Sequence, residues 1–230
     1  MLTVSLTSVP PRFPGLGRVV ESLQNQSVPL RIIVQLPERY HRFPEWDGNL
    51  PALPPGVEVR RTPLDFGPAT KLFPLLGPGS DPTRDILIAD DDNLYAPDWA
   101  AGFLNARQMH PQAAIAASAF PVRRLGLTPA PSDEHRIAQG FAGILLRPGM
   151  LHGDVLQMPD RFRAVDDIWI SGQLAAAGTN ILHMPKVRTS VRPVTADLAP
   201  LQSESHFGLS RAEANRAAAV YLRERYGIWS

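Results

Sequence analysis

Three consecutive carboxylates, Asp90, Asp91 and Asp92, follow the short apolar run 86–89. The run is brief and rich in isoleucine, which is typical of a buried strand in a mostly parallel sheet. The carboxylates would then lie at the carboxyl end of that strand, where open α/β sheets bind their ligands. Adjacent negative charges repel one another, so a cation would stabilise them, and oxygen-only ligands favour Mg²⁺ or Mn²⁺. A solvated acidic turn ending at Asn93 is the alternative.

A second acidic pair, Asp166 and Asp167, stands later in the chain, where residues 165–174 predict the beginning of a helix that ends at Gly178. Carboxylates at a helix N-terminus can simply cap the helix and interact favourably with its dipole. The alternative is that one of them is a general base facing the first acidic cluster. A general base must lie within hydrogen-bond reach of the proton that it removes, which a sequence cannot show.

Asp65 and Lys71 enclose a short segment that contains Gly67 and Pro68. A lysine at the beginning of a short helix can reach a phosphate, aided by the helix N-terminus. A surface lysine on a turn is the alternative. The Gly-x4-Gly-Lys-Ser/Thr spacing of a Walker A loop is absent.

Two histidines and one tryptophan are further candidates. His206 lies in a tail and His183 ends a predicted strand, so either could be a third metal ligand. A lone histidine is more often a surface residue or a satisfied core residue. Trp169 follows the acidic pair and is either a core residue or an apolar platform for a sugar ring.

The elements that must position these residues alternate between strands and helices, which indicates an α/β architecture. The first strand–helix–strand unit should have a right-handed crossover. Strands are expected at 2–6, 31–36, 57–61, 85–89, 113–119, 141–146 and 180–182, and helices at 16–24, 71–76, 97–109, 165–177 and 210–226.

Three stretches lack periodicity. Residues 38–55 are expected to form an irregular surface excursion, 121–134 a mobile loop, and 188–208 a tail. The last helix begins with a partial capping box, Ser210 followed by Glu213.

Composition excludes several classes of protein. A chain of 230 residues suits one α/β domain, and a net charge of +1 argues against a dedicated nucleic-acid binder. The absence of cysteine excludes disulfides and thiol chemistry. No signal peptide and no run of ~20 apolar residues is found, so we expect a cytoplasmic protein, with peripheral contact to the inner face of the membrane as a further option.

The acidic triplet resembles the Asp-x-Asp signature of GT-A-fold glycosyltransferases. Residues 6–13 with 22–26 are similar to the start of bacterial family-2-like transferases, and 65–71 to the segment that those proteins place before the Asp-x-Asp strand. Residues 166–169 resemble the motif that carries the catalytic base in inverting members. The segments occur in the expected order over residues 3–178, and the end of the chain matches nothing known.

The resemblance implies a GT-A-like fold, a mostly parallel sheet flanked by helices, with a C-terminal helical tail. It implies one domain over 1–230, with a nucleotide-binding half at 1–95, an acceptor and catalytic half at 96–185, and a tail and helix at 186–230.

It also implies roles for individual residues. The nucleotide would be surrounded by Thr7, Ser8, Arg12, Asp65, Lys71, Asp90 and Asp91. Mn²⁺ or Mg²⁺ would be held by Asp92 and Asp90 and would stabilise charge on the departing diphosphate. His206 stays a candidate third ligand on the residues alone. Glycines in 139–143 would allow close approach of the donor sugar and the acceptor.

The activity implied is transfer of a sugar from a nucleotide sugar, with a UDP-sugar as the first expectation, to a glycan, lipid-linked or protein acceptor. Asp167 would deprotonate the acceptor hydroxyl, with Asp166 beside it, and the product would be inverted. If both residues only cap the helix, retention of configuration stays open. The extra acid leaves open which carboxylates of the triplet act. The short chain suggests an acceptor side that is minimal or completed by a partner.

Two other functions compete with this one. A Mg²⁺-dependent phosphohydrolase of the haloacid-dehalogenase type also places aspartates after a buried strand, but near the N-terminus and with Thr or Val where this chain has Leu94. A non-catalytic carbohydrate-binding or scaffold protein of the same fold is the other alternative.

Overall fold

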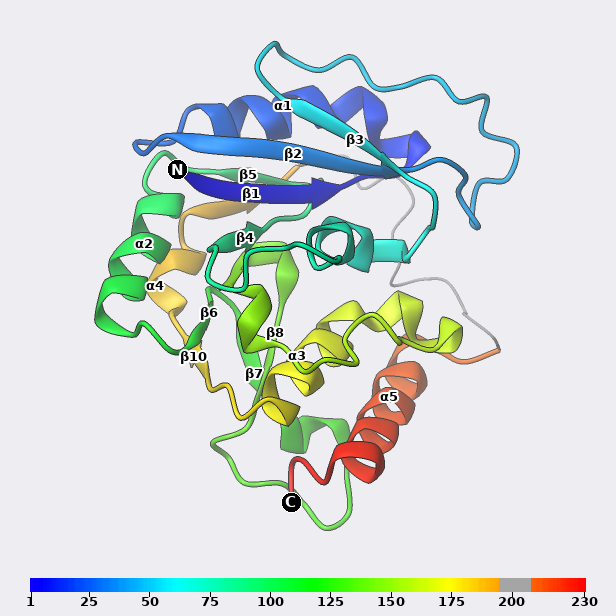
Figure 1. The fold of residues 1–230 in the computed structure, drawn as a ribbon, viewed down its shortest axis with the longest axis vertical. Helices are drawn as coiled ribbons and strands as arrows, with labels where there is room; N and C mark the ends of the chain where they lie inside the picture. Colours follow the sequence, from blue (N-terminus) through cyan, green and yellow to red (C-terminus); the bar gives the residue numbers. More distant parts are fainter. Residues whose placement is uncertain (195–207) are drawn as a thin grey trace.

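A computed structural model describes residues 1–194 and 208–230 (Figure 1). Its centre is a 7-stranded sheet with the order β10-β6-β9-β4-β1-β2-β3. The strands are β1 (Leu2–Thr7), β2 (Leu30–Pro37), β3 (Glu58–Thr62), β4 (Ile86–Ile88), β6 (Ala114–Ala116), β9 (Ile144–Leu146) and β10 (Ile181–His183). All of them run parallel except β9, which is antiparallel to both β4 and β6. The expected α/β fold with a mostly parallel sheet is confirmed.

Two small antiparallel sheets flank the main one. Strand β5 (Asn93–Tyr95) pairs with β11 (Val191–Pro193), and β7 (Ala119–Pro121) pairs with β8 (Arg136–Ala138). The sequence did not predict these pairings, because strands of three residues are too short to show an apolar alternation.

The helices are α1 (Phe13–Gln24), α2 (Trp99–Met109), α3 (Asp166–Ala176), α4 (Pro185–Arg188) and α5 (Arg211–Tyr226). The core forms two clusters, one containing residues of α1 and α2 and the other residues of α3 and α5. Leu87 belongs to the first cluster, whereas Ile86 and Ile88 belong to the second. Strand β4 is therefore buried on both faces, as a central parallel strand must be.

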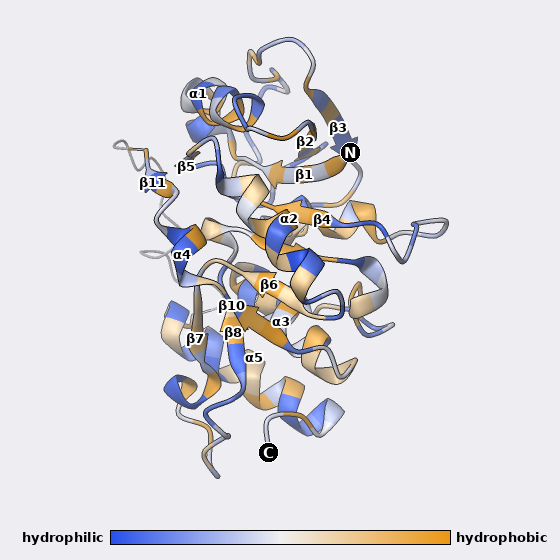
Figure 2. Ribbon diagram, turned by 90° about the vertical axis from the view of Figure 1, so that its left-hand side faces the viewer, coloured by the Kyte–Doolittle hydropathy of each residue, from blue (hydrophilic) through white to orange (hydrophobic). Residues whose placement is uncertain are grey.

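Hydropathy follows this arrangement. The central strands β4 and β6 are hydrophobic, whereas the edge strand β3 is hydrophilic (Figure 2). Charged side chains on an edge strand discourage pairing with another chain. Within the described residues, none of the helices is both long enough and apolar enough to cross a lipid bilayer.

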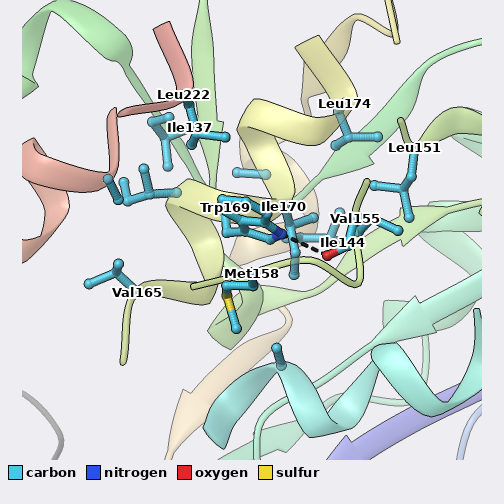
Figure 3. Packing of buried hydrophobic residues seen from close by; sticks show 14 of the residues in the cluster. Ile137, Ile144, Leu151, Val155, Met158, Val165, Trp169, Ile170, Leu174 and Leu222 are labelled. Carbon is cyan, nitrogen blue, oxygen red and sulfur yellow. Dashed lines mark hydrogen bonds between the residues drawn. The ribbon is translucent and has the colours of Figure 1, made fainter. Parts of the chain in front are cut away.

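Trp169 is a residue of α3 whose side chain lies in the core beside Val155 (Figure 3), and its ring stacks on Tyr221 of α5. Its side chain is fully buried, and its indole N–H donates a hydrogen bond of 2.8 Å to the carbonyl oxygen of Val155. The idea of Trp169 as a sugar platform is therefore wrong. A Cβ added to Gly172 would lie 2.5 Å from Leu222, so this glycine permits the close approach of α3 and α5.

Several predicted boundaries change. Helix α1 begins earlier, at Phe13, because Pro14 fits the first turn. The helix expected up to residue 76 consists of two 3₁₀ turns, η2 (Gly67–Lys71) and η3 (Phe73–Leu75), each with a proline in its first turn. The 3₁₀ turn η5 (Gly140–Ala142) replaces the first part of the strand expected at 141–146.

The stretch 121–134 was expected to be a mobile loop, but it is partly ordered by packing. Strands β7 and β8 pair across it, and a 3₁₀ turn, η4 (Val122–Leu125), places Val122 in the core. The capping box of α5 is confirmed, since the Ser210 hydroxyl accepts from the Glu213 N–H and the Glu213 carboxylate accepts from the Ser210 N–H.

Candidate active site

A hollow lies where β1, β2 and β4 end. Every residue that the sequence placed around a nucleotide lines this first hollow: Thr7, Ser8, Arg12, Asp65, Lys71, Asp90 and Asp91. Val9, Pro37, Tyr40 and Pro68 add apolar surface to its wall. Parallel strands end at one edge of a sheet, which is why residues from distant segments meet here.

Asp91 points toward the loop after β1. Its carboxylate accepts a hydrogen bond of 2.5 Å from the Ser8 hydroxyl and one of 2.7 Å from the Arg12 guanidinium. Burial raises the pKa of Asp91, while Arg12 and Ser8 act in the opposite direction. Arg12 also lies 3.2 Å from a carboxylate oxygen of Asp92. Asp91 therefore fixes the position of Arg12, and the two outer members of the triplet face the open space.

Lys71 is a buried cation and not a surface lysine. Its ammonium lies 2.6 Å from Asp90 and 3.1 Å from Asp166, and its side chain is 3% exposed. Burial alone would lower the pKa of Lys71, but the surrounding carboxylates outweigh that effect and raise it well above the usual value. The ammonium is thus held within the protein by carboxylates, although it lines the first hollow.

Asp167 lines a second hollow, together with Asp90 and Asp92. One oxygen of Asp167 accepts a hydrogen bond of 2.9 Å from the Gly140 N–H. Burial and the nearby charge of Asp166 raise the pKa of Asp167 to about 7, against the opposing effect of a neighbouring lysine. A carboxyl group that titrates near neutral pH suits general base catalysis.

Asp166 lies behind Asp167 and lines neither of these two hollows. It is buried, and its carboxylate forms an ion pair with Lys71. The N-cap of α3 is Val165, without any side-chain cap. Neither Asp166 nor Asp167 therefore caps α3 through its side chain. Both residues do lie in the first turn of the helix, where negative charge is favoured.

Gly140 allows this arrangement. A Cβ at this position would lie 2.7 Å from the Lys71 ammonium and 3.2 Å from the Asp167 carboxylate. Any other residue would push these two groups away from their partners.

The two hollows share Arg12 and Asp90 and are therefore neighbours. The second hollow extends away from the sheet, and its wall adds Asn93, Phe120, Gln139, Phe141, Ile168, Arg188, Pro193, Val194, Arg211 and Asn215. The sequence reasoning missed Arg188 and Arg211, because they come from the part of the chain that matched no motif.

Tyr95 was also missed. Its hydroxyl accepts a hydrogen bond of 2.9 Å from the Asp90 N–H and donates one of 3.0 Å to the Asp90 carbonyl oxygen. This pair of bonds fixes the backbone of Asp90. Tyr95 belongs to the three-residue strand β5, and nothing in its local sequence marked it.

The oxygen ligands for a metal ion would be Asp90 and Asp92, whose side chains are 29% and 35% exposed. No group of three or more potential ligands occurs within residues 1–194 and 208–230. Mg²⁺ commonly binds through one or two carboxylates and completes its shell with water and substrate phosphates, so two such residues fit it. His206 lies outside the described residues, and His183 ends the edge strand β10.

Two cations of the protein lie among these carboxylates. Arg12 lies beside Asp91 and Asp92, and Lys71 lies between Asp90 and Asp166, so each cation is shared by two carboxylates and offsets only part of the negative charge. A bound Mn²⁺ or Mg²⁺ at Asp90 and Asp92 would offset more of it.

The fold is that of the GT-A glycosyltransferases. The mannosyltransferase PcManGT from Pyrobaculum calidifontis, in complex with GDP-Man and Mn²⁺, matches with a TM-score of 0.51 and 17% identity over 81% of this chain and 55% of the other. S. aureus TarS 1–349, in complex with UDP-GlcNAc, matches with a TM-score of 0.54 and 10% identity over 89% of this chain and 61% of the other.

The chain thus spans less than two thirds of the length of these two structures. Neither a protein-family model nor a curated protein matches the sequence. At such low identity the likeness establishes the fold alone.

Proposed function

We propose that the protein is a glycosyltransferase that moves a sugar from a nucleoside-diphosphate sugar to an acceptor hydroxyl, with inversion of configuration. The observation that carries the proposal is the position of Asp167. A carboxyl group with a pKa near 7 lines the same hollow as Asp90 and Asp92, next to the hollow that contains the expected nucleotide residues.

The first hollow would hold the nucleotide. The Asp65 carboxylate is fixed at its wall, because it accepts hydrogen bonds of 2.8 Å from the His41 N–H and 2.7 Å from the Gly67 N–H. A UDP-sugar remains the first expectation, and a guanine nucleotide is the alternative, since one fold neighbour holds GDP-Man and the other UDP-GlcNAc.

The diphosphate would lie at the junction of the two hollows, beside Arg12. This guanidinium is fixed by Asp91 and offers positive charge without further reorganisation. Asp90 and Asp92 would hold Mn²⁺ or Mg²⁺, which when bound supplies Lewis-acid stabilisation of charge on the departing diphosphate.

Asp167 would act as the general base. It would take the proton of the acceptor hydroxyl while the acceptor oxygen attacks the anomeric carbon. The bond between that carbon and the diphosphate oxygen breaks, and the diphosphate leaves with the bonding electron pair. Attack from the face opposite the leaving group inverts the configuration. Asp166 would act through Lys71 and would hold the base in place.

The proposed division of labour follows the chain. The residues around the first hollow all come from 1–95, and the base comes from 96–185. The segment 186–230 contributes Arg188 and Arg211 to the second hollow, so we assign it to the acceptor side. The cytoplasm remains the proposed location.

Thermal melting with a panel of nucleoside diphosphates, with and without Mn²⁺, tests donor binding. A ligand at 100-fold its dissociation constant adds about 2.7 kcal/mol, or roughly 5–10 °C for a domain of this size. Asp92→Asn should lose the Mn²⁺-dependent part of the shift. The absence of a shift with every nucleotide would contradict the proposal.

Asp167→Asn tests catalysis, because the amide oxygen can still accept from the Gly140 N–H. This variant should bind the nucleotide as the wild type does and lose transfer. If wild-type and variant proteins are equally inactive with every donor and acceptor, the chain is a binding protein. Release of phosphate without a sugar acceptor would instead indicate a phosphohydrolase.

A further inference from the structure

Two arginines, one at the end of α4 and one at the beginning of α5, lie at one end of the second hollow. Arg188 and Arg211 line the hollow. Arg124 lies over the ring of Phe120, another wall residue, at 5.7 Å from its centroid. We propose that the acceptor carries an anionic group, a phosphate or a carboxylate, that binds between Arg188 and Arg211. This inference rests on the proposed function, since the acceptor side is defined by Asp167.

Arg188 is held in place and keeps donors available. Its guanidinium lies 4.9 Å from the centroid of the Phe141 ring and donates one hydrogen bond of 2.7 Å to the Val191 carbonyl oxygen. A guanidinium has five N–H donors, so one such bond leaves most of them for a ligand. Stacking on an aromatic ring fixes the plane of the group, which favours two-point binding of an oxyanion.

Arg211 is the first residue of α5, a 16-residue helix. Its position adds the side-chain charge to the positive end of the helix dipole. No carboxylate within residues 1–194 and 208–230 forms an ion pair with Arg188 or Arg211. Some surface arginines pair with carboxylates, as Arg225 does with Asp154, whereas others, such as Arg216 and Arg223, donate to backbone carbonyl oxygens. What sets Arg188 and Arg211 apart is that both line one concave site, and cations in a concave site attract an anion.

The carboxylates of the same hollow do not cancel this field. Asp90 lies against Lys71, and Asp92 lies against Arg12. Asp167 has a raised pKa and accepts from the backbone. The carboxylates of the hollow thus lie at the strand termini, where Lys71 and Arg12 offset part of their charge, and Arg211 lies at the other end, on α5.

Uncharged wall residues indicate what the anionic group is attached to. Gln139 and Asn215 offer amides for the hydroxyl groups of a saccharide, whereas the rings of Phe120 and Phe141 each carry an arginine guanidinium over one face. The acceptor class that fits all of these groups is a saccharide or polyol that carries a phosphate or carboxylate.

The test is a titration of the protein already saturated with a nucleoside diphosphate and Mg²⁺, followed by ¹⁵N NMR. Inorganic phosphate serves as the phosphate probe, glucuronate as the carboxylate probe, and glucose as the neutral control. We expect one or both anions to bind to wild type more tightly than glucose. In Arg211→Gln the anion affinity should fall about 10-fold to 100-fold, which is the effect of losing a charge-assisted hydrogen bond.

The matched control is Arg84→Gln, which removes the same charge from an exposed arginine before the amino end of β4 and should leave the affinity unchanged. Phosphate binding alone identifies a phosphorylated acceptor, and glucuronate binding identifies a carboxylated one. Equal binding of glucose, no anion binding to wild type, or unchanged binding in Arg211→Gln overturns the inference. If no nucleoside diphosphate binds, the proposed function fails, whereas the same titration of the free protein still tests the arginines.

Discussion

Gly140→Ala is the substitution that tests the architecture of the site most directly. The new Cβ would lie 2.7 Å from the Lys71 ammonium, whereas ordinary contact begins at 3.4 Å, so the ammonium must move by about 0.7 Å. Because Lys71 is buried between Asp90 and Asp166, this shift lengthens ion pairs of 2.6 and 3.1 Å. The Asp167 oxygen, at 3.2 Å from the new atom, must also move slightly.

The expected result is a large loss of activity with a small loss of stability. Gly140 is not among the glycines with positive φ, so alanine suits its backbone. The displaced atom is the end of a flexible side chain, so the stability cost stays near the low end for overpacking, about 1 kcal/mol, or roughly 2–4 °C in Tm. A misplacement approaching 1 Å at the reacting groups can lower the turnover number by about 10-fold to 100-fold.

The assay measures kcat for sugar transfer, Tm, and the affinity for the nucleoside diphosphate in wild type and variant. Gly15→Ala in α1 is the matched control, since a Cβ there meets no atom within 4 Å. Wild-type kcat in Gly140→Ala would refute the reasoning that Lys71 and Asp167 must lie this close to the backbone. A loss of nucleotide binding equal to the loss of kcat would refute the assignment of Gly140 to the base side.

Three further predictions concern the charges and the core. Activity that requires deprotonated Asp167 should rise with pH through about 7, because the pKa of Asp167 is raised to that value. Asp166→Asn removes a neighbouring negative charge, so the midpoint of the pH–rate profile should move to lower pH. An unchanged or higher midpoint would contradict the charge of Asp166 as a cause of the raised pKa. Arg12→Gln leaves the buried Asp91 without its cation and should lower the free energy of unfolding by about 3 kcal/mol. Urea titrations at neutral pH measure this change, and an effect below about 1 kcal/mol would show that the Arg12–Asp91 pair is not buried in solution. Trp169→Phe removes a buried indole hydrogen bond and should lower the free energy of unfolding by about 1–3 kcal/mol while kcat stays unchanged. A loss of kcat without a loss of stability would contradict a purely structural role for Trp169.

Local sequence patterns were sufficient for the scaffold of the main sheet. The apolar run before Asp90 and the prolines and glycines around each strand marked where the central strands end. The antiparallel direction of β9 could not be predicted, because an apolar run of this length has no direction of its own. Strands β5 and β11 pair although they lie far apart in the sequence, Tyr95 opposite Val191, and no local pattern predicts such a contact.

The candidate site was likewise predictable only in part. The residues that the resemblance assigned to the nucleotide do lie around one hollow, since strand ends meet at one edge of the sheet. The burial and the ion pairs of Lys71 could not be predicted from the sequence, because its two partners, Asp90 and Asp166, are far apart in the sequence and meet only in the folded chain. The same holds for Arg12, whose ion pair with Asp91 joins residues 79 positions apart in the sequence.

The single ammonium of Lys71 lies between Asp90, which lines both hollows, and the pair Asp166 and Asp167, whose second member is the proposed base. A ligand that moves Asp90 away from this ammonium strengthens the interaction of the Lys71 charge with Asp166 and Asp167. The pKa of Asp167 would therefore fall. Linkage is reciprocal, so loss of the Asp167 proton must then strengthen the binding of that same ligand by an equal free energy. Under the proposed function, donor binding and deprotonation of Asp167 are therefore coupled, and the coupling can be measured as protons released to the buffer when a nucleoside diphosphate binds.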